Sequence, residues 1–319
     1  MEKIRLLYPL LVASVLTFLS TVHAAELCKQ WGEPVKVGDL DGSTISETSG
    51  LAVSHVYQDR LYYVNDSGDG PYFYQGSRKG TPIKQIEVET SYPTDVEDLA
   101  YGNCLGNQKC LVVGDIGDNK RRRSSIRFIA ILETANFGAK VKPWKVVTAR
   151  YPDGPHNAEA MAMHPNGDLF VVTKDEGWGH EDQISEVFRL PANQWQNSDQ
   201  NSVLMMEKVG QWNLSLILRS APPRAKTITG MTIDPSGKRM ILLAYENAIE
   251  LALDLSEPFK TVDQWIAGQT FQIIPLRNLN QQEAISFSQF EPGHLAFIYN
   301  TEKKPGDSTA PQYEVTCRN

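Results

Sequence analysis

Residues 159–172 read Glu-Ala-Met-Ala-Met-His-Pro-Asn-Gly-Asp-Leu-Phe-Val-Val, and this stretch decides the fold. A short run rich in apolar residues leads into a Pro-Asn-Gly turn, and a second apolar run follows, which is the pattern of a β-hairpin. Related segments begin 48 to 70 residues apart along the chain. They are Ser49-Gly-Leu-Ala52, Glu97-Asp-Leu-Ala100, Thr229-Gly-Met-Thr232 and Glu283-Ala-Ile-Ser286.

Five such hairpins predict an all-β protein, because most are followed by two further strand-like runs, such as 126–132 and 141–150. Four strands per repeat of this length are typical of a propeller blade. The last repeat has three strands, and we expect residues 27–37 to add the fourth beside 312–316. The prediction is a single five-bladed β-propeller over residues 25–319, with its ring closed by the N-terminal strand.

The first 24 residues have the features of a signal peptide: Lys3 and Arg5, an apolar run over 6–19, and small residues ending at Ala24. We therefore expect export to a periplasm or to the outside of the cell. No later run reaches the roughly 20 apolar residues that a membrane-spanning helix needs.

The four cysteines of the chain predict disulfides, because an even number in an exported protein is usually paired. Cys104 and Cys110 flank a turn-like insert and are expected to staple one hairpin. Cys28 and Cys317 would then join the two ends of the chain. A zinc site fits poorly, since neither pair has a CxxC spacing.

The formal net charge is −7, and the one dense basic run is 120–123. Proteins that bind nucleic acid carry a broader basic surface. We exclude DNA or RNA binding as the main role and expect a monomer.

The first residue of each hairpin is expected at one mouth of the propeller channel, which gathers Ser49, Glu97, Glu159, Thr229 and Glu283. Several glutamates near one axis raise one another's pKa unless a positive charge compensates them. An all-oxygen ligand set favours Ca²⁺ over softer metal ions. The alternative is that the glutamates pair with Lys or Arg, or accept backbone hydrogen bonds.

The order of these five residues resembles the secreted calcium-activated nucleotidase (apyrase) family. Propellers of that family hold one Ca²⁺ in the channel with Ser, Glu, Glu, Ser and Glu, and Thr229 replaces the second Ser here. The resemblance implies a Ca²⁺ cofactor and a nucleotide substrate. The strings 65–69 (Asn-Asp-Ser-Gly-Asp) and 114–119 (Gly-Asp-Ile-Gly-Asp-Asn) also look like a group of uncharacterised exported bacterial propellers.

Two loops at the same mouth carry further candidates. Asp66 and Asp115 could activate a water molecule, and Arg121 and Arg122 could hold a phosphate group. The alternatives are an Asp/Gly turn at 65–70 and a solvated, self-neutralising loop around the arginines.

The third loop carries Lys174, a second candidate for phosphate binding, and Trp178, a candidate stacking platform for a base or sugar. His156 precedes Glu159 and is a candidate general acid or base. Trp178 could equally anchor an exposed turn, and His156 could be a hydrogen-bonded structural residue.

Three functions remain open from the sequence. The first is a Ca²⁺-dependent hydrolase of nucleotides or other phosphorylated small molecules. The second is a non-catalytic propeller that binds a surface partner or a glycan and whose calcium is structural. The third is a glycosidase that uses two of the channel glutamates.

Overall fold

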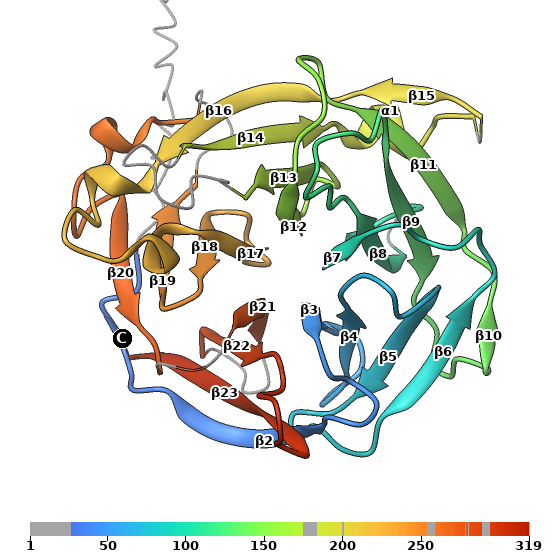
Figure 1. The fold of residues 1–319 in the computed structure, drawn as a ribbon, viewed down its shortest axis with the longest axis horizontal. Helices are drawn as coiled ribbons and strands as arrows, with labels where there is room; N and C mark the ends of the chain where they lie inside the picture. Colours follow the sequence, from blue (N-terminus) through green and yellow to red (C-terminus); the bar gives the residue numbers. More distant parts are fainter. Residues whose placement is uncertain are drawn as a thin grey trace, which may run out of the picture.

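The computed structural model describes residues 27–318, except 107, 175–183, 200, 254–258, 278, 280 and 289–293. Five sheets surround a central channel, with the first strand of each sheet innermost (Figure 1). The predicted five-bladed, all-β propeller is therefore confirmed.

The five blades follow one another along the chain. Blade 1 contains β3 (Thr48–Val53), β4 (Leu61–Asn65), β5 (Tyr72–Gly76) and β6 (Lys84–Val88). Blade 2 contains β7 (Val96–Asn103), β8 (Lys109–Asp115), β9 (Ile126–Leu132) and β11 (Lys145–Arg150). Blade 3 contains β12 (Ala158–Met163), β13 (Leu169–Thr173), β14 (Ile184–Leu190) and β16 (Glu207–Asn213). Blade 4 contains β17 (Ile228–Ile233), β18 (Arg239–Ala244), β19 (Asn247–Ala252) and β20 (Phe271–Pro275); blade 5 contains β21 (Gln282–Ser288), β22 (Ala296–Thr301), β23 (Thr309–Arg318) and β2 (Val35–Asp41). The described helices are short: α1 (Ala192–Trp195) and three 3₁₀ turns, η1 (Leu214–Leu216), η2 (Pro223–Lys226) and η3 (Val262–Gln264).

The N-terminal segment closes the ring, as predicted. Strand β2 pairs antiparallel with β23, and the short β1 (Gln30–Trp31) pairs with the end of β23. The segment predicted as one run is split near Pro34, which has no N–H to donate to a sheet. A disulfide joins Cys28 to Cys317, and a second joins Cys104 to Cys110, so both predicted pairings are confirmed.

Two short strands link neighbouring blades at their outer edges. Strand β10 (Lys140–Val141) leaves blade 2 and pairs parallel with β6 of blade 1. Strand β15 (Val203–Met205) pairs in the same way with β11 of blade 2. The single run expected over 141–150 is therefore two strands on two blades, separated by Pro143.

Apolar side chains fill the interfaces between neighbouring blades. Val112 and Phe128 of blade 2, for example, pack in one cluster with Met161 and Phe188 of blade 3. Such interfaces hold the five sheets around the channel, because each sheet buries both faces against its neighbours. In the part of the chain that is described, no helix has the length and apolar character needed to span a membrane.

Candidate metal centre at one mouth of the channel

A β-bulge marks the same position in every blade. The register between the first and second strands shifts by one residue in all five sheets. A bulge re-aims the side chain of the extra residue. The residues at the shifts are the five predicted ring residues, and each is at most 5% exposed: Ser49, Glu97, Glu159, Thr229 and Glu283.

The two hydroxyl groups of this ring tie neighbouring blades together. Ser49 Oγ donates to the carbonyl oxygen of Glu97 at 2.5 Å. Thr229 Oγ1 donates to the carbonyl oxygen of Gln282 at 2.6 Å. Each hydroxyl oxygen keeps lone pairs that can still accept a hydrogen bond or coordinate a cation.

Glu159 is neutralised by a side chain of its own blade. Lys174 Nζ lies 3.0 Å from Glu159 Oε2, and Asn157 Nδ2 donates to Glu159 Oε1 at 3.1 Å. Burial opposes the charge of Lys174, but the nearby Glu159, Tyr245 and Glu283 offset it and raise the lysine pKa. For this one glutamate, the structure shows the ion pair that the sequence left as an alternative to metal binding.

Glu97 lies among carboxylates instead. One oxygen each of Glu97, Asp66 and Asp95 lies within 4.8 Å of the others. Burial raises the pKa of Glu97 well above its usual value, and the charges of nearby carboxylates raise it further. Burial and the same neighbourhood raise the pKa of Asp95 to about 6. We call these three residues the acidic triad. Their three carboxylates together carry a net negative charge when they are ionised.

A glycine allows the backbone to pass against the acidic triad. A Cβ atom at Gly117 would collide with Glu97 Oε1 and with Asp95 Oδ2. The Gly117 N–H donates to the Asp95 carbonyl oxygen at 3.1 Å, which fixes this approach. The donor set contains only oxygen atoms, so it fits a hard cation such as Ca²⁺.

Glu283 meets a second carboxyl group at the ring. Burial and a side-chain hydrogen bond with Glu302 raise the pKa of Glu283 well above its usual value. A cavity of about 420 Å³ opens beside Glu302, and its lining includes Glu47 and Lys303. The mouth therefore offers room for a small molecule next to the ring.

Asp115 is placed beneath the acidic triad. Its fully buried carboxylate lies 2.8 Å from Arg123 Nη2 and 2.7 Å from Arg127 Nη2. Asp115 Oδ1 also accepts hydrogen bonds from the backbone N–H groups of Thr94 and Asp95. These contacts fix the backbone that carries the triad.

The other predicted residues lie apart from the triad or outside the description. Arg121 and Arg122 are exposed on the loop after β8. His156 is paired with Asp153, at 2.7 Å, and lies 3.4 Å from Glu186. Trp178 lies outside the described residues.

Sequence reasoning missed Asp95 and Tyr245. Asp95 stands two residues before Glu97, a spacing that can place two strand residues on one face and was a usable signal. Tyr245 follows β18, and the Lys174 Nζ lies 5.5 Å from the centre of its ring. No sequence motif marks this tyrosine, because the contact joins blade 3 to blade 4.

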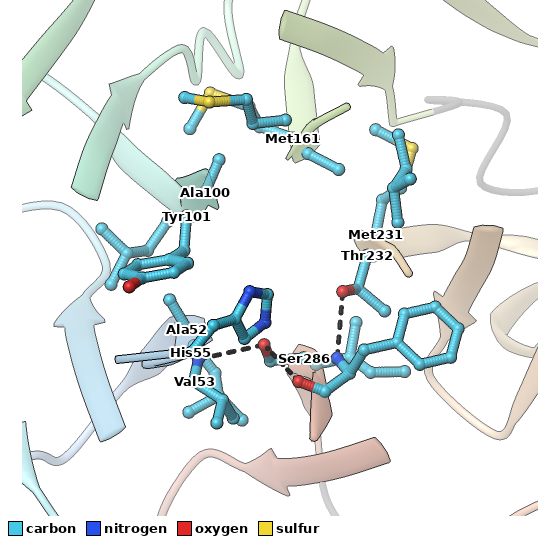
Figure 2. Close-up of a pocket in the computed structure, with 16 residues that line it drawn as sticks. Ala52, Val53, His55, Ala100, Tyr101, Met161, Met231, Thr232 and Ser286 are labelled. Atoms are coloured by element: carbon cyan, nitrogen blue, oxygen red, sulfur yellow. Dashed lines mark hydrogen bonds between the residues drawn. The ribbon is translucent and has the colours of Figure 1, made fainter. Parts of the chain in front are cut away.

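The opposite half of the channel is nearly filled. Figure 2 shows Met161, Met231 and Tyr101 around a space whose Ser286 and Thr232 hydroxyls accept backbone hydrogen bonds from Val53 and Phe287. The cavity there measures about 20 Å³, which is room for about one water molecule.

No family model and no curated protein sequence matches this chain. Among solved structures, a luciferin-regenerating enzyme is similar at 11% identity and a TM-score of 0.45, covering 88% of this chain and 95% of that one. The PQQ-bound aldose sugar dehydrogenase from Streptomyces coelicolor is similar at 11% identity and a TM-score of 0.44, covering 90% of this chain and 98% of that one. Likeness at this level carries no information about activity.

Proposed function

We propose that this chain is an exported Ca²⁺-dependent hydrolase that acts on a nucleotide or another phosphorylated small molecule. The observation that carries the proposal is the acidic triad, Asp66, Asp95 and Glu97, whose carboxylate oxygens lie within 4.8 Å of one another at the bulge ring. Such a set is stable at neutral pH only with bound protons or a bound cation. The all-oxygen donor set fits a hard cation such as Ca²⁺.

The triad would hold the ion, with the Ser49 hydroxyl beside it. When bound, calcium supplies the positive charge that stabilises the charge developing on a phosphoryl group. Of the two residues predicted to activate water, Asp115 is ion-paired with two arginines, so we assign this role to Asp66. Asp66 belongs to the loop after β4 and is only half-buried, which leaves it accessible to water.

The chain's own cations would hold the substrate. Lys174 is fixed beside Glu159 and Tyr245, and its raised pKa keeps it charged at neutral pH. Arg121 and Arg122 are exposed on the loop after β8, and a guanidinium can bind a phosphate through two parallel hydrogen bonds. The cavity beside Glu302 gives the rest of the substrate a place to lie.

The test is a turnover screen of nucleotides, phosphomonoesters and glycosides, with Ca²⁺ or with a chelator. We expect Ca²⁺-dependent release of phosphate, and a loss of at least about 100-fold in Glu97→Gln because the ion is then poorly held. Asp199→Asn, which changes an exposed carboxylate away from the ring, is the control. Stabilisation by Ca²⁺ without turnover of any substrate would instead support a non-catalytic binding propeller, and Ca²⁺-independent release of sugar would support a glycosidase.

A further inference from the structure

A second set of ligand atoms converges where the segment between β11 and β12 meets β14 of blade 3. Asp153 Oδ1, His156 Nε2 and Glu186 Oε2 all lie within 4.8 Å of one another. His156 Nε2 is 2.7 Å from the aspartate oxygen and 3.4 Å from the glutamate oxygen. Glu186 Oε2 is buried and accepts no hydrogen bond within the described residues. One imidazole nitrogen carries at most one proton, so it cannot satisfy both carboxylates equally.

Lys208 orients both carboxylates from behind. Its Nζ lies 2.8 Å from Asp153 Oδ2 and 2.5 Å from Glu186 Oε1. These are the oxygens that do not face His156. The lysine therefore turns the other oxygen of each carboxylate towards the imidazole, which is how supporting residues orient metal ligands.

Aromatic rings hold the imidazole in place. The ring of His156 lies 5.0 Å from that of Tyr151 and 5.1 Å from that of Phe188, centre to centre. The His156 side chain is only 19% exposed, whereas that of Asp153 is 37% exposed. The nitrogen is thus fixed at the edge of the protein, with solvent on the aspartate side.

We propose that Asp153, His156 and Glu186 bind a late first-row divalent metal ion such as Zn²⁺, separately from the calcium of the acidic triad. One imidazole nitrogen with two carboxylate oxygens is a ligand set of zinc, and three protein ligands leave a fourth position open to water or to a ligand. A tetrahedral zinc with bonds of about 2.0–2.2 Å sets its ligand atoms about 3.3 Å apart. The His156–Glu186 separation of 3.4 Å already matches that spacing.

The proposal is tested on the mature, disulfide-bonded protein after treatment with a chelator. Zn²⁺ alone is titrated calorimetrically, and Co²⁺ is added separately to read its visible absorption, which reports nitrogen and oxygen ligands directly. We expect one Zn²⁺ per chain, unaffected by millimolar Ca²⁺, and a loss of affinity of at least about tenfold in His156→Gln. His55→Gln changes a histidine at the opposite mouth and serves as the matched control.

Equal Zn²⁺ affinity in His156→Gln and the wild type would overturn the proposal, and so would a wild type that binds no Zn²⁺ and gives no Co²⁺ spectrum. Circular dichroism checks that each variant is folded. If His156→Gln fails to fold, Glu186→Gln replaces it, because this change keeps the side-chain volume and one oxygen while removing the ligand charge. The test does not involve phosphate release, so its outcome is independent of the calcium-dependent activity.

Discussion

Lys174 Nζ lies 3.0 Å from Glu159 Oε2, so one ring glutamate has a counterion within the chain while Glu97 faces two other carboxylates. The charge at the mouth of the channel is therefore unevenly distributed. On blade 3 the carboxylate of Glu159 is balanced by Lys174, whereas between blades 1 and 2 the carboxylates of the acidic triad face one another. This uneven charge would allow a cation and an anionic substrate to be held side by side at the mouth.

Removing Lys174 should leave Glu159 buried without a positive partner. Both side chains are largely buried, at 16% and 4% exposure. We expect Lys174→Met to cost about 3 kcal/mol in the free energy of unfolding, because breaking a buried ion pair strands a charge. The double variant Lys174→Met/Glu159→Gln should recover most of this loss in urea unfolding. Equal losses in the single and double variants would show that the unpaired charge of Glu159 is not the cause of the loss.

Stability without metal should depend on pH through the acidic triad. The pKa of Asp95 is raised to about 6 by burial and by neighbouring charges. The folded state therefore holds a proton that the unfolded state has released, and stability should fall as the pH rises from about 4 to about 6. Thermal unfolding in a chelator measures this slope, which should flatten in Asp95→Asn.

Bound calcium should reverse the loss of stability that the acidic triad causes as the pH rises. Binding to the folded state alone raises the melting temperature as Ca²⁺ is added, and the effect should be larger at pH 7.5 than at pH 5 because protons compete for the same oxygens. Thermal scans at several Ca²⁺ concentrations check this, with Glu97→Gln as the insensitive variant. An equal shift in wild type and variant would place the ion elsewhere.

The two disulfides should differ in their contribution to stability. The Cys28–Cys317 bond joins residues 289 positions apart, and in the loop-entropy model its removal costs about 6 kcal/mol. The Cys104–Cys110 bond spans 6 positions and should contribute about 2 kcal/mol. Denaturant unfolding of the two double Cys→Ser variants compares them, and a larger loss at the short bridge would contradict the model.

Asp98 should be required for the inner wall of the channel. Its fully buried carboxylate accepts backbone hydrogen bonds from Leu99 at 2.7 Å and from Met161 at 2.6 Å, so it connects blade 2 to blade 3. Asp98→Ala would leave these donors without an acceptor and cost about 3 kcal/mol or more. Exposed Asp199→Ala is the control and should stay within about 0.5 kcal/mol of the wild type in the same unfolding assay.

The repeat pattern was enough to predict the architecture and the five equivalent first-strand positions, because the same short motif recurs at the same place in each blade. It could not predict that Lys174 would pair with Glu159, or that Asp115 would be ion-paired to Arg123 and Arg127, since side-chain partners depend on the packed structure. The transfer of β10 to blade 1 was missed for a similar reason. A two-residue strand carries too little pattern to show which sheet it joins.

The closure of blade 5 has a consequence for the order in which the protein can assemble. Strand β2 precedes blade 1 along the chain, but its partner β23 follows blade 4. The strands of each of blades 1 to 4 lie close together in the sequence, whereas β1 and β2 have no sheet partner until β23 is present. The ring can therefore close only after β23 has been made, once strands from far apart in the sequence meet.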